Sequence, residues 1–201
     1  DLSLCLMHWL RTEAPRHDSG VGYLELDFDA EAFPEVEGVP SGFALYPYIR
    51  ESRRIRSLTT VREQDVSADA HPGLDRAPSF ADSIGIGAYR LDLHPSTNGA
   101  NTIDTSSLPF EIPLGLIIPR RMRNLLAAAK NVGTTHLTNG CYRLHPLEWN
   151  LGEAAGLLVA YSHERKAEPH AVHASPDEFL RLVEDQGIRR QWPRDLKLRA
   201  L

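Results

Sequence analysis

Cysteine is scarce in this sequence. Only Cys5 and Cys141 occur among its 201 residues, and they lie far apart, in no CxxC pattern. This argues against a zinc site and a disulfide framework and is consistent with a reducing compartment, so we expect a cytoplasmic protein. Long hydrophobic runs are also lacking. The apolar stretch 2–10 ends at Arg11 and is too short to span a bilayer, and we expect it to pack against another part of the protein.

Positive charge is not in excess either. The formal net charge is −5, and 42% of the residues are hydrophobic and 24% charged. The acidic balance argues against nucleic acid or an anionic membrane as the main partner. The composition is that of an ordinary folded domain, and the length allows one large domain or a domain with an appendage.

A complete GxGxxG fingerprint for a dinucleotide is missing. Gly85 and Gly87 form a GxG pair, but Arg90 stands where the third glycine belongs, and the surrounding residues are typical of a continuous strand rather than a strand–turn–helix unit. We interpret the two glycines as part of a bulged or closely packed strand. The sequence therefore predicts no unit of its own for holding a dinucleotide pyrophosphate.

The first 113 residues are expected to form two zones. Residues 1–42 are predicted to be irregular, with one alternating segment at 22–28 that indicates a half-exposed strand. Residues 43–113 are predicted to be rich in strands, notably at 54–61 and 84–93, because β-branched, aromatic and alternating apolar residues dominate there.

The third zone, 114–201, is predicted to combine a strand with helices. A buried strand at 124–130 leads through a flexible polar loop at 131–140 into a helix that begins at Leu147, and Pro146 suits the first turn of that helix. Such a helix start offers unpaired N–H groups and a positive dipole, which suit a phosphate, a carboxylate or the electron-rich edge of a reduced flavin.

A second helix is predicted at residues 175–187. Ser175 can cap it, Glu178 completes a capping box, and Gly187 follows its last apolar turn. Phe179, Leu182 and Val183 share a face, so we assign this helix a packing role.

Several separated motifs carry a family resemblance. They are YIRESRRI (48–55), DSIGIGAYRLDLH (82–94), IPLGLIIP (112–119), and the block that runs from NLLAAAKN to GEAAG (124–156). The chain resembles the C-terminal portion of the FAD-dependent oxidoreductases, two-domain flavoproteins whose nucleotide-binding half is related to that of glutathione reductase. The resemblance implies an α/β fold, with a mixed-sheet substrate domain over 43–113 and, over 114–201, the C-terminal strand–loop–helix part of an FAD-binding domain.

Candidate catalytic residues lie around the predicted loop and helix. His136 and His145 bracket Arg143, so two groups able to exchange protons flank a permanent cation. A hydrogen-bonded structural role remains the alternative for each histidine. Glu148 is expected to cap the helix or to pair with Arg143. Because the resemblance places this region beside FAD, it implies that the cofactor is held by Asn139, Gly140, Glu148, Trp149, Gly152, Glu153, Ala154 and Ala155.

A second constellation lies on the strand-rich zone. Asp92 and His94 are two residues apart on a predicted strand, so both project to one face, where they could bind a metal or form a carboxylate–imidazole pair. A metal would need a further ligand that no neighbour supplies, so we predict none. The resemblance implies a substrate-facing role for Asp92, His94 and Arg53, the last beside Ser52, whereas a solvent-facing sheet edge is the alternative for the pair.

The resemblance implies a flavin-dependent oxidation or reduction of a small organic substrate. Since the GxGxxG unit is missing, we expect a C-terminal fragment that needs its N-terminal FAD-binding half or a partner chain, and that binds FAD weakly and is inactive alone. The alternative is a non-catalytic packing or assembly module, which could form a homo-oligomer. A metal-dependent hydrolase that uses Asp92, His94 and another histidine is a third and weaker interpretation.

Overall fold

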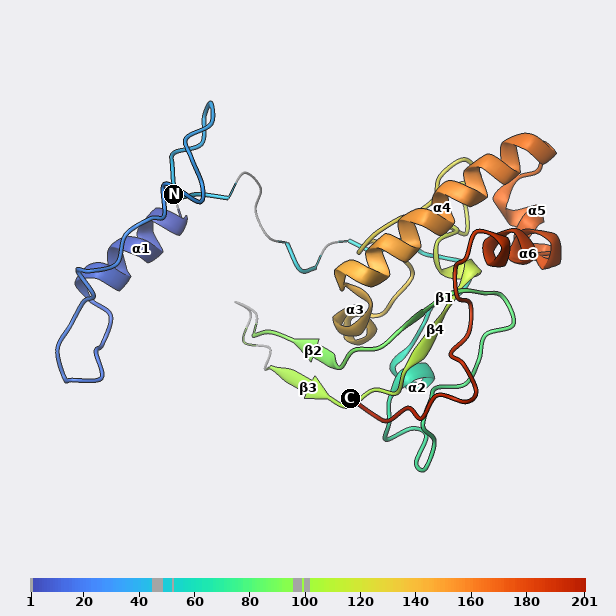
Figure 1. Cartoon of the computed structure of the whole chain (residues 1–201), viewed down its shortest axis with the longest axis horizontal. Helices are drawn as coiled ribbons and strands as arrows, with labels where there is room; N and C mark the ends of the chain where they lie inside the picture. The colour runs from blue at the N-terminus through green and yellow to red at the C-terminus, as the bar shows by residue number, and fades with distance from the viewer. Residues whose placement is uncertain (1, 45–48, 52, 96–98, 100–101) are drawn as a thin grey trace. The chain divides into compact units, whose positions relative to one another are not determined.

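The computed structural model describes residues 2–44, 49–51, 53–95, 99 and 102–201 (Figure 1). They divide into two compact units, Asp1–Ile49 and Arg50–Leu201, which we call unit 1 and unit 2. Among the described residues, no helix is both long and apolar enough to cross a bilayer.

Unit 1 consists of helix α1 (Leu2–Thr12) and irregular chain. The strand predicted at 22–28 is wrong, because this segment has no partner strand among the described residues. It folds back on the helix, where the Tyr23 N–H donates to the Leu10 carbonyl at 2.9 Å. Gly22 permits this return with φ of 73°, and a Cβ there would lie 2.3 Å from the Arg11 carbonyl oxygen. No residue of α1 is buried.

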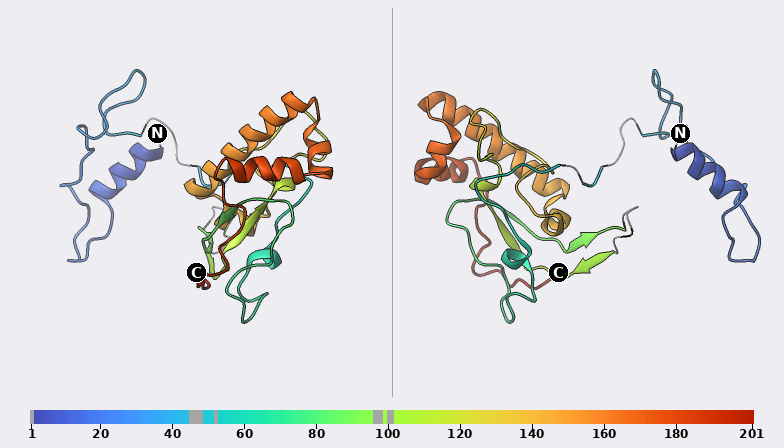
Figure 2. Two further views of the ribbon diagram at one scale, coloured as in Figure 1. Left: turned by 45° about the vertical axis from the view of Figure 1, so that its right-hand side comes forward. Right: turned by 180° about the vertical axis from the view of Figure 1, so that it is seen from behind.

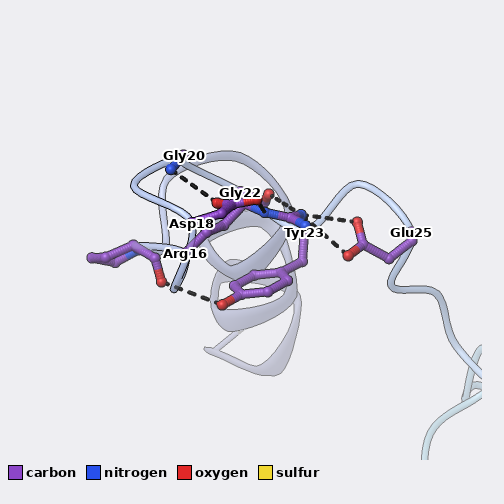
Figure 3. A network of polar contacts seen from close by, with 7 residues as sticks. Arg16, Asp18, Gly20, Gly22, Tyr23 and Glu25 are labelled. Carbon is purple, nitrogen blue, oxygen red and sulfur yellow. Dashed lines mark hydrogen bonds and ion pairs between the residues drawn. The ribbon is translucent and has the colours of Figure 1, made fainter.

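The loop after α1 is closed by the side chain of Arg16 (Figure 3). Its Nη1 donates to the Gly22 carbonyl at 3.0 Å and to Glu25 Oε1 at 3.1 Å, and its Nε lies 3.4 Å from Asp18 Oδ2. The guanidinium also lies 4.6 Å from the centre of the Tyr23 ring. These contacts hold the loop in place of a regular hydrogen-bonded ladder.

Unit 2 contains two antiparallel strand pairs. Strand β1 (Ser83–Gly87) pairs with β4 (Phe110–Pro113), and β2 (Leu91–Leu93) pairs with β3 (Ile103–Thr105). The prediction of a strand at 84–93 is thus confirmed in two parts. The α/β composition is confirmed as well, since helices complete the unit.

The glycines of β1 serve packing. The register of β1 against β4 shifts between Ser83 and Ile86, which marks a bulge or irregularity. A Cβ on Gly85 would lie 1.7 Å from Asn150 Oδ1, and one on Gly87 would lie 2.5 Å from the Phe110 ring. The interpretation of Gly85 and Gly87 as part of a bulged, closely packed strand is confirmed.

Two predicted strands of unit 2 are wrong. Residues 54–61 take part only in isolated bridges, such as that between Ser57 and Pro119. Residues 124–130 are irregular, and only Ala127 among them is buried. The neighbouring alanines Ala128 and Ala129 are exposed, and no described strand pairs with the segment.

Helices cover the β1–β4 pair. The predicted helix is confirmed as α4 (His145–Arg165), with Pro146 in its first turn, and it packs on β1 (Figure 2). The shorter helices are α2 (Glu63–Val66), α3 (His136–Tyr142), α5 (Pro169–Ala174) and α6 (Asp177–Asp185). Helix α3 replaces the second half of the predicted polar loop, because the Thr135 hydroxyl caps it by accepting from the Thr138 N–H at 3.1 Å.

Helix α6 confirms the second predicted helix but not its cap. Ser175 ends α5 and makes no cap to α6, and Glu178 pairs instead with Arg165 of α4. Phe179 and Val183 are fully buried as predicted, and Leu182 is partly buried against the core. The core therefore lies between α4, α6 and strand β4, together with the 3₁₀ turn η1 (Leu114–Leu116) that follows β4.

Candidate functional site

Three polar or small residues of α3 share one face. His136 is the first residue of the helix, Gly140 follows four residues later, and Arg143, its C-cap, three residues after that. Seven residues make about two helical turns, so these three positions lie in a row. The sequence thus aligns two of the predicted catalytic residues along one side of a short helix.

This face of α3 lies directly against β2. A Cβ on Gly140 would lie 2.8 Å from the carbonyl oxygen of Asp92 and 2.9 Å from its nitrogen, so only glycine permits the contact. The close approach brings Arg143 to the strand, where its Nη2 donates to the Asp92 carbonyl at 2.6 Å.

Arg143 is held from a second side by Glu51. Its side chain is only 6% exposed, and Nη1 lies 3.3 Å from Glu51 Oε1. The other carboxylate oxygen of Glu51 lies 3.0 Å from Nδ1 of His136. We call Glu51, Asp92, His136 and Arg143 the Glu51 cluster. A buried cation, a bridging carboxylate and a half-exposed imidazole are thus assembled from three segments that are distant in sequence.

His94 extends the cluster along β2. Its Nε2 lies 3.6 Å from Asp92 Oδ2, so the two side chains project to one face as predicted. His94 is 52% exposed, which leaves the pair open to solvent. Within the described part of the chain, no three potential metal ligands gather at one point.

The remaining predicted catalytic and substrate residues are exposed. His145 is exposed at the start of α4, and Arg53 is exposed on the segment that follows Glu51. Ser52 lies outside the described residues. The predicted pairing of Glu148 with Arg143 is wrong. The carboxylate that pairs with Arg143 is that of Glu51, and Glu148 Oε1 lies 3.8 Å from Nζ of Lys130 instead.

The predicted cofactor residues of α4 divide between two faces. Ala154 and Ala155 are buried in the core, whereas Gly152, Glu153 and Trp149 are exposed, Trp149 by 78%. The small residues of α4 therefore lie on both its faces: the alanines pack against the core, and Gly152 lies on the exposed face.

The two predicted cofactor residues of α3 are enclosed. Asn139 and Gly140 are both buried, and the Asn139 amide donates to the Lys130 carbonyl at 3.2 Å. Its Oδ1 and the nearby Thr134 Oγ1 are buried without a hydrogen-bond partner among the described residues. The first turn of α4 also lacks a side-chain hydrogen bond at its N-cap, which is Leu144. Polar atoms of the region thus retain unused hydrogen-bonding capacity.

Glu51 is the functional candidate that sequence reasoning missed. It stands in the basic motif YIRESRRI as its one acidic residue, between Arg50 and Arg53. A single carboxylate in a run of arginines is the signal that could have identified it, since such a group must find a cationic or hydrogen-bonding partner when it is partly buried.

Comparison with known proteins gives the family. The model of the FAD dependent oxidoreductase family matches residues 1–183, which includes unit 1 and most of unit 2. The curated proteins and the solved structures yielded no match. The family match spans the Glu51 cluster and all the motifs on which the resemblance was based. The chain therefore belongs to the FAD dependent oxidoreductase family, and FAD is the cofactor that this family implies.

Proposed function

We propose that this chain is the C-terminal portion of a flavoprotein oxidoreductase and forms the wall of its FAD and substrate sites. The observation that carries the proposal is the Glu51 cluster, which joins a buried arginine to a half-exposed histidine beside the open start of α4. The substrate in this proposal is a small organic molecule, and its oxidation or reduction proceeds with the flavin.

The polar groups around the start of α4 fit a flavin ring. The N-terminus of α4 carries a positive dipole end and no side-chain cap, which suits an electron-rich carbonyl edge. Asn139 Oδ1, an acceptor, and the Thr134 hydroxyl, a donor and acceptor, are buried and lack a partner among the residues that the structure describes. Asn139, with the first turn of α4, would therefore hold the ring. When bound, the flavin supplies the hydride acceptor or donor.

The chain's own residues supply charge and a proton carrier. Arg143 contributes a positive charge, which its bonds to Glu51 and Asp92 hold in place. His136, 59% exposed, can take up or release the substrate proton. Asp92 and His94 form the substrate-facing side of the site, and Arg53 supplies a further cation for an anionic substrate.

A partner for this wall is also part of the proposal. The sequence contains no GxGxxG unit, and the two glycines of the GxG pair in β1 are packed against Asn150 and Phe110. The outer face of α4 leaves Gly152, Gly156 and Val159 exposed, a small-residue surface that a second structural layer can approach closely. We propose that an N-terminal half or a partner chain covers it and holds the ADP moiety.

The test compares the chain alone with the chain joined to its other half. We expect the purified chain to bind no stoichiometric FAD by absorbance, and its fusion to a strand–GxGxxG–helix segment encoded upstream to bind FAD and undergo substrate-dependent bleaching. Stoichiometric FAD on the chain alone contradicts the fragment proposal. A fusion that stays free of flavin, together with a stable flavin-free homo-oligomer, favours the assembly module instead.

A further inference from the structure

The orientation of His136 is set by the atom through which it meets Glu51. A carboxylate only accepts hydrogen bonds, and Glu51 Oε2 lies 3.0 Å from Nδ1. In the neutral ring the hydrogen must therefore reside on Nδ1, which leaves the lone pair on Nε2. This is the less common tautomer of a free histidine side chain, so the protein must impose it.

Glu51 can impose it because the carboxylate is itself held. Its Oε1 lies 3.3 Å from Arg143 Nη1, and Arg143 is 6% exposed and anchored on the Asp92 carbonyl. Each oxygen thus serves a different partner, and the two contacts together fix the plane of the carboxylate. The arrangement is that of an outer residue that fixes the tautomer of a functional histidine.

The backbone of His136 is fixed as well. Thr135 and Thr138 form a reciprocal capping box at 2.9 and 3.1 Å, so α3 begins at His136 with a defined geometry. The His136 side chain is 59% exposed, which makes its free ring edge accessible.

We propose that Glu51 is a positioning residue that locks His136 in the Nδ1–H tautomer and thereby presents Nε2 as the proton acceptor of the site. The proton accepted at Nε2 gives an imidazolium whose charge Glu51 offsets, and Nδ1 keeps its hydrogen throughout. What the proton transfer serves rests on the proposed function, whereas the tautomer is a property of the chain alone.

The test is the tautomer itself, measured by two-bond ¹H–¹⁵N correlation on the full labelled chain, without flavin, at a pH where histidines are neutral. His136→Gln identifies the signal. We expect the Nδ1–H form in the wild type. In Glu51→Gln the amide oxygen must face Arg143, which turns its NH₂ group toward His136 Nδ1, so we expect inversion to the Nε2–H form. Glu51→Ala, which removes the acceptor, has the same expected direction.

Asp92→Asn is the matched control. It alters the neighbour of His94 Nε2 and leaves the backbone carbonyl that holds Arg143, so the His136 tautomer should not change. An Nε2–H signal for His136 in the wild type overturns the proposal, even if a variant fails to fold. So does an unchanged tautomer in both folded Glu51 variants. Because no flavin or turnover is involved, loss of the proposed oxidoreductase function would leave this result standing.

Discussion

Glu111 is a charged residue in β4, the most buried of the described strands. All four residues of β4 are buried, and the Glu111 carboxylate accepts a hydrogen bond from the Phe80 N–H at 2.9 Å. Burial raises the pKa of Glu111, and the bond from Phe80 and the charge of Arg190 offset this only in part. The ionised carboxyl therefore costs stability.

The sign of the resulting pH effect can be tested with Glu111→Gln. Because the folded pKa of Glu111 is raised above its ordinary value of 4.5, its favourable contribution is complete below about pH 4.5 and is lost as pH rises through the folded pKa. Glutamine keeps an acceptor for Phe80 without the charge. We expect the variant to be more stable than the wild type at pH 7, by about 1 kcal/mol, in urea unfolding. The gain should vanish near pH 4, and a gain independent of pH would contradict the assignment.

At the scale of elements, the contact between α3 and β2 positions the Glu51 cluster. It depends on the missing side chain of Gly140, because the strand's backbone at Asp92 fills the space. A helix usually gains stability when glycine is replaced, so packing and helix propensity oppose each other at this position.

In Gly140→Ala we expect the steric clash with β2 to cost more stability than the higher helix propensity of alanine gains. The methyl group would meet backbone atoms at 2.8 and 2.9 Å, which cannot rotate away. We expect a loss of about 1–3 kcal/mol in the free energy of unfolding, measured in urea.

Gly156→Ala in α4 is the matched control, since a Cβ there meets nothing within 4 Å. It should stabilise the chain by up to about 1 kcal/mol. If the two substitutions shift stability in the same direction, the Gly140 contact is not tight.

At the scale of the whole molecule, the segment 188–201 returns to the strands of unit 2. Arg190 Nε donates to the Ser83 carbonyl at 2.7 Å, and Trp192 Nε1 donates to the Phe110 carbonyl at 3.0 Å. Arg76 donates to three carbonyls of the segment, at Trp192, Pro193 and Leu196. An irregular segment is therefore bound to both β1 and β4.

Arg190→Ala should loosen this segment. The side chain of Arg190 is 15% exposed, and its loss leaves the Ser83 carbonyl short of a charged donor. We expect a cost of about 1–3 kcal/mol and faster hydrogen exchange at backbone amides of 188–192. Arg199→Ala, at an exposed position of the same segment, should change stability by less than about 0.5 kcal/mol. If the two variants change stability equally, Arg190 does not anchor the segment 188–201.

Local signals predicted the elements that depend on local sequence. Pro146 and the alternation in β1 identified α4 and the strand because their causes lie within a few residues. The strands predicted at 54–61 and 124–130 were wrong because pairing needs a partner that the segment itself does not reveal.

The same limit applies to the site. His136 and Arg143 were grouped from their closeness in sequence, but Asp92 was assigned to a separate constellation, and Glu51 meets Arg143 across 92 positions of sequence. Only the fold shows that contact.

The anchoring of residues 188–201 also bears on the order of events during synthesis on the ribosome. Strands β1 and β4 emerge before the donors that cover their carbonyls, because Arg190 follows Ser83 by 107 residues and Trp192 follows Phe110 by 82. Until then these carbonyls must remain hydrated or be shielded by chaperones, so the nascent unit 2 cannot reach its final packing while it grows. The described backbone hydrogen bonds of unit 1, such as that from Tyr23 to Leu10, join residues close in sequence and can form without this delay.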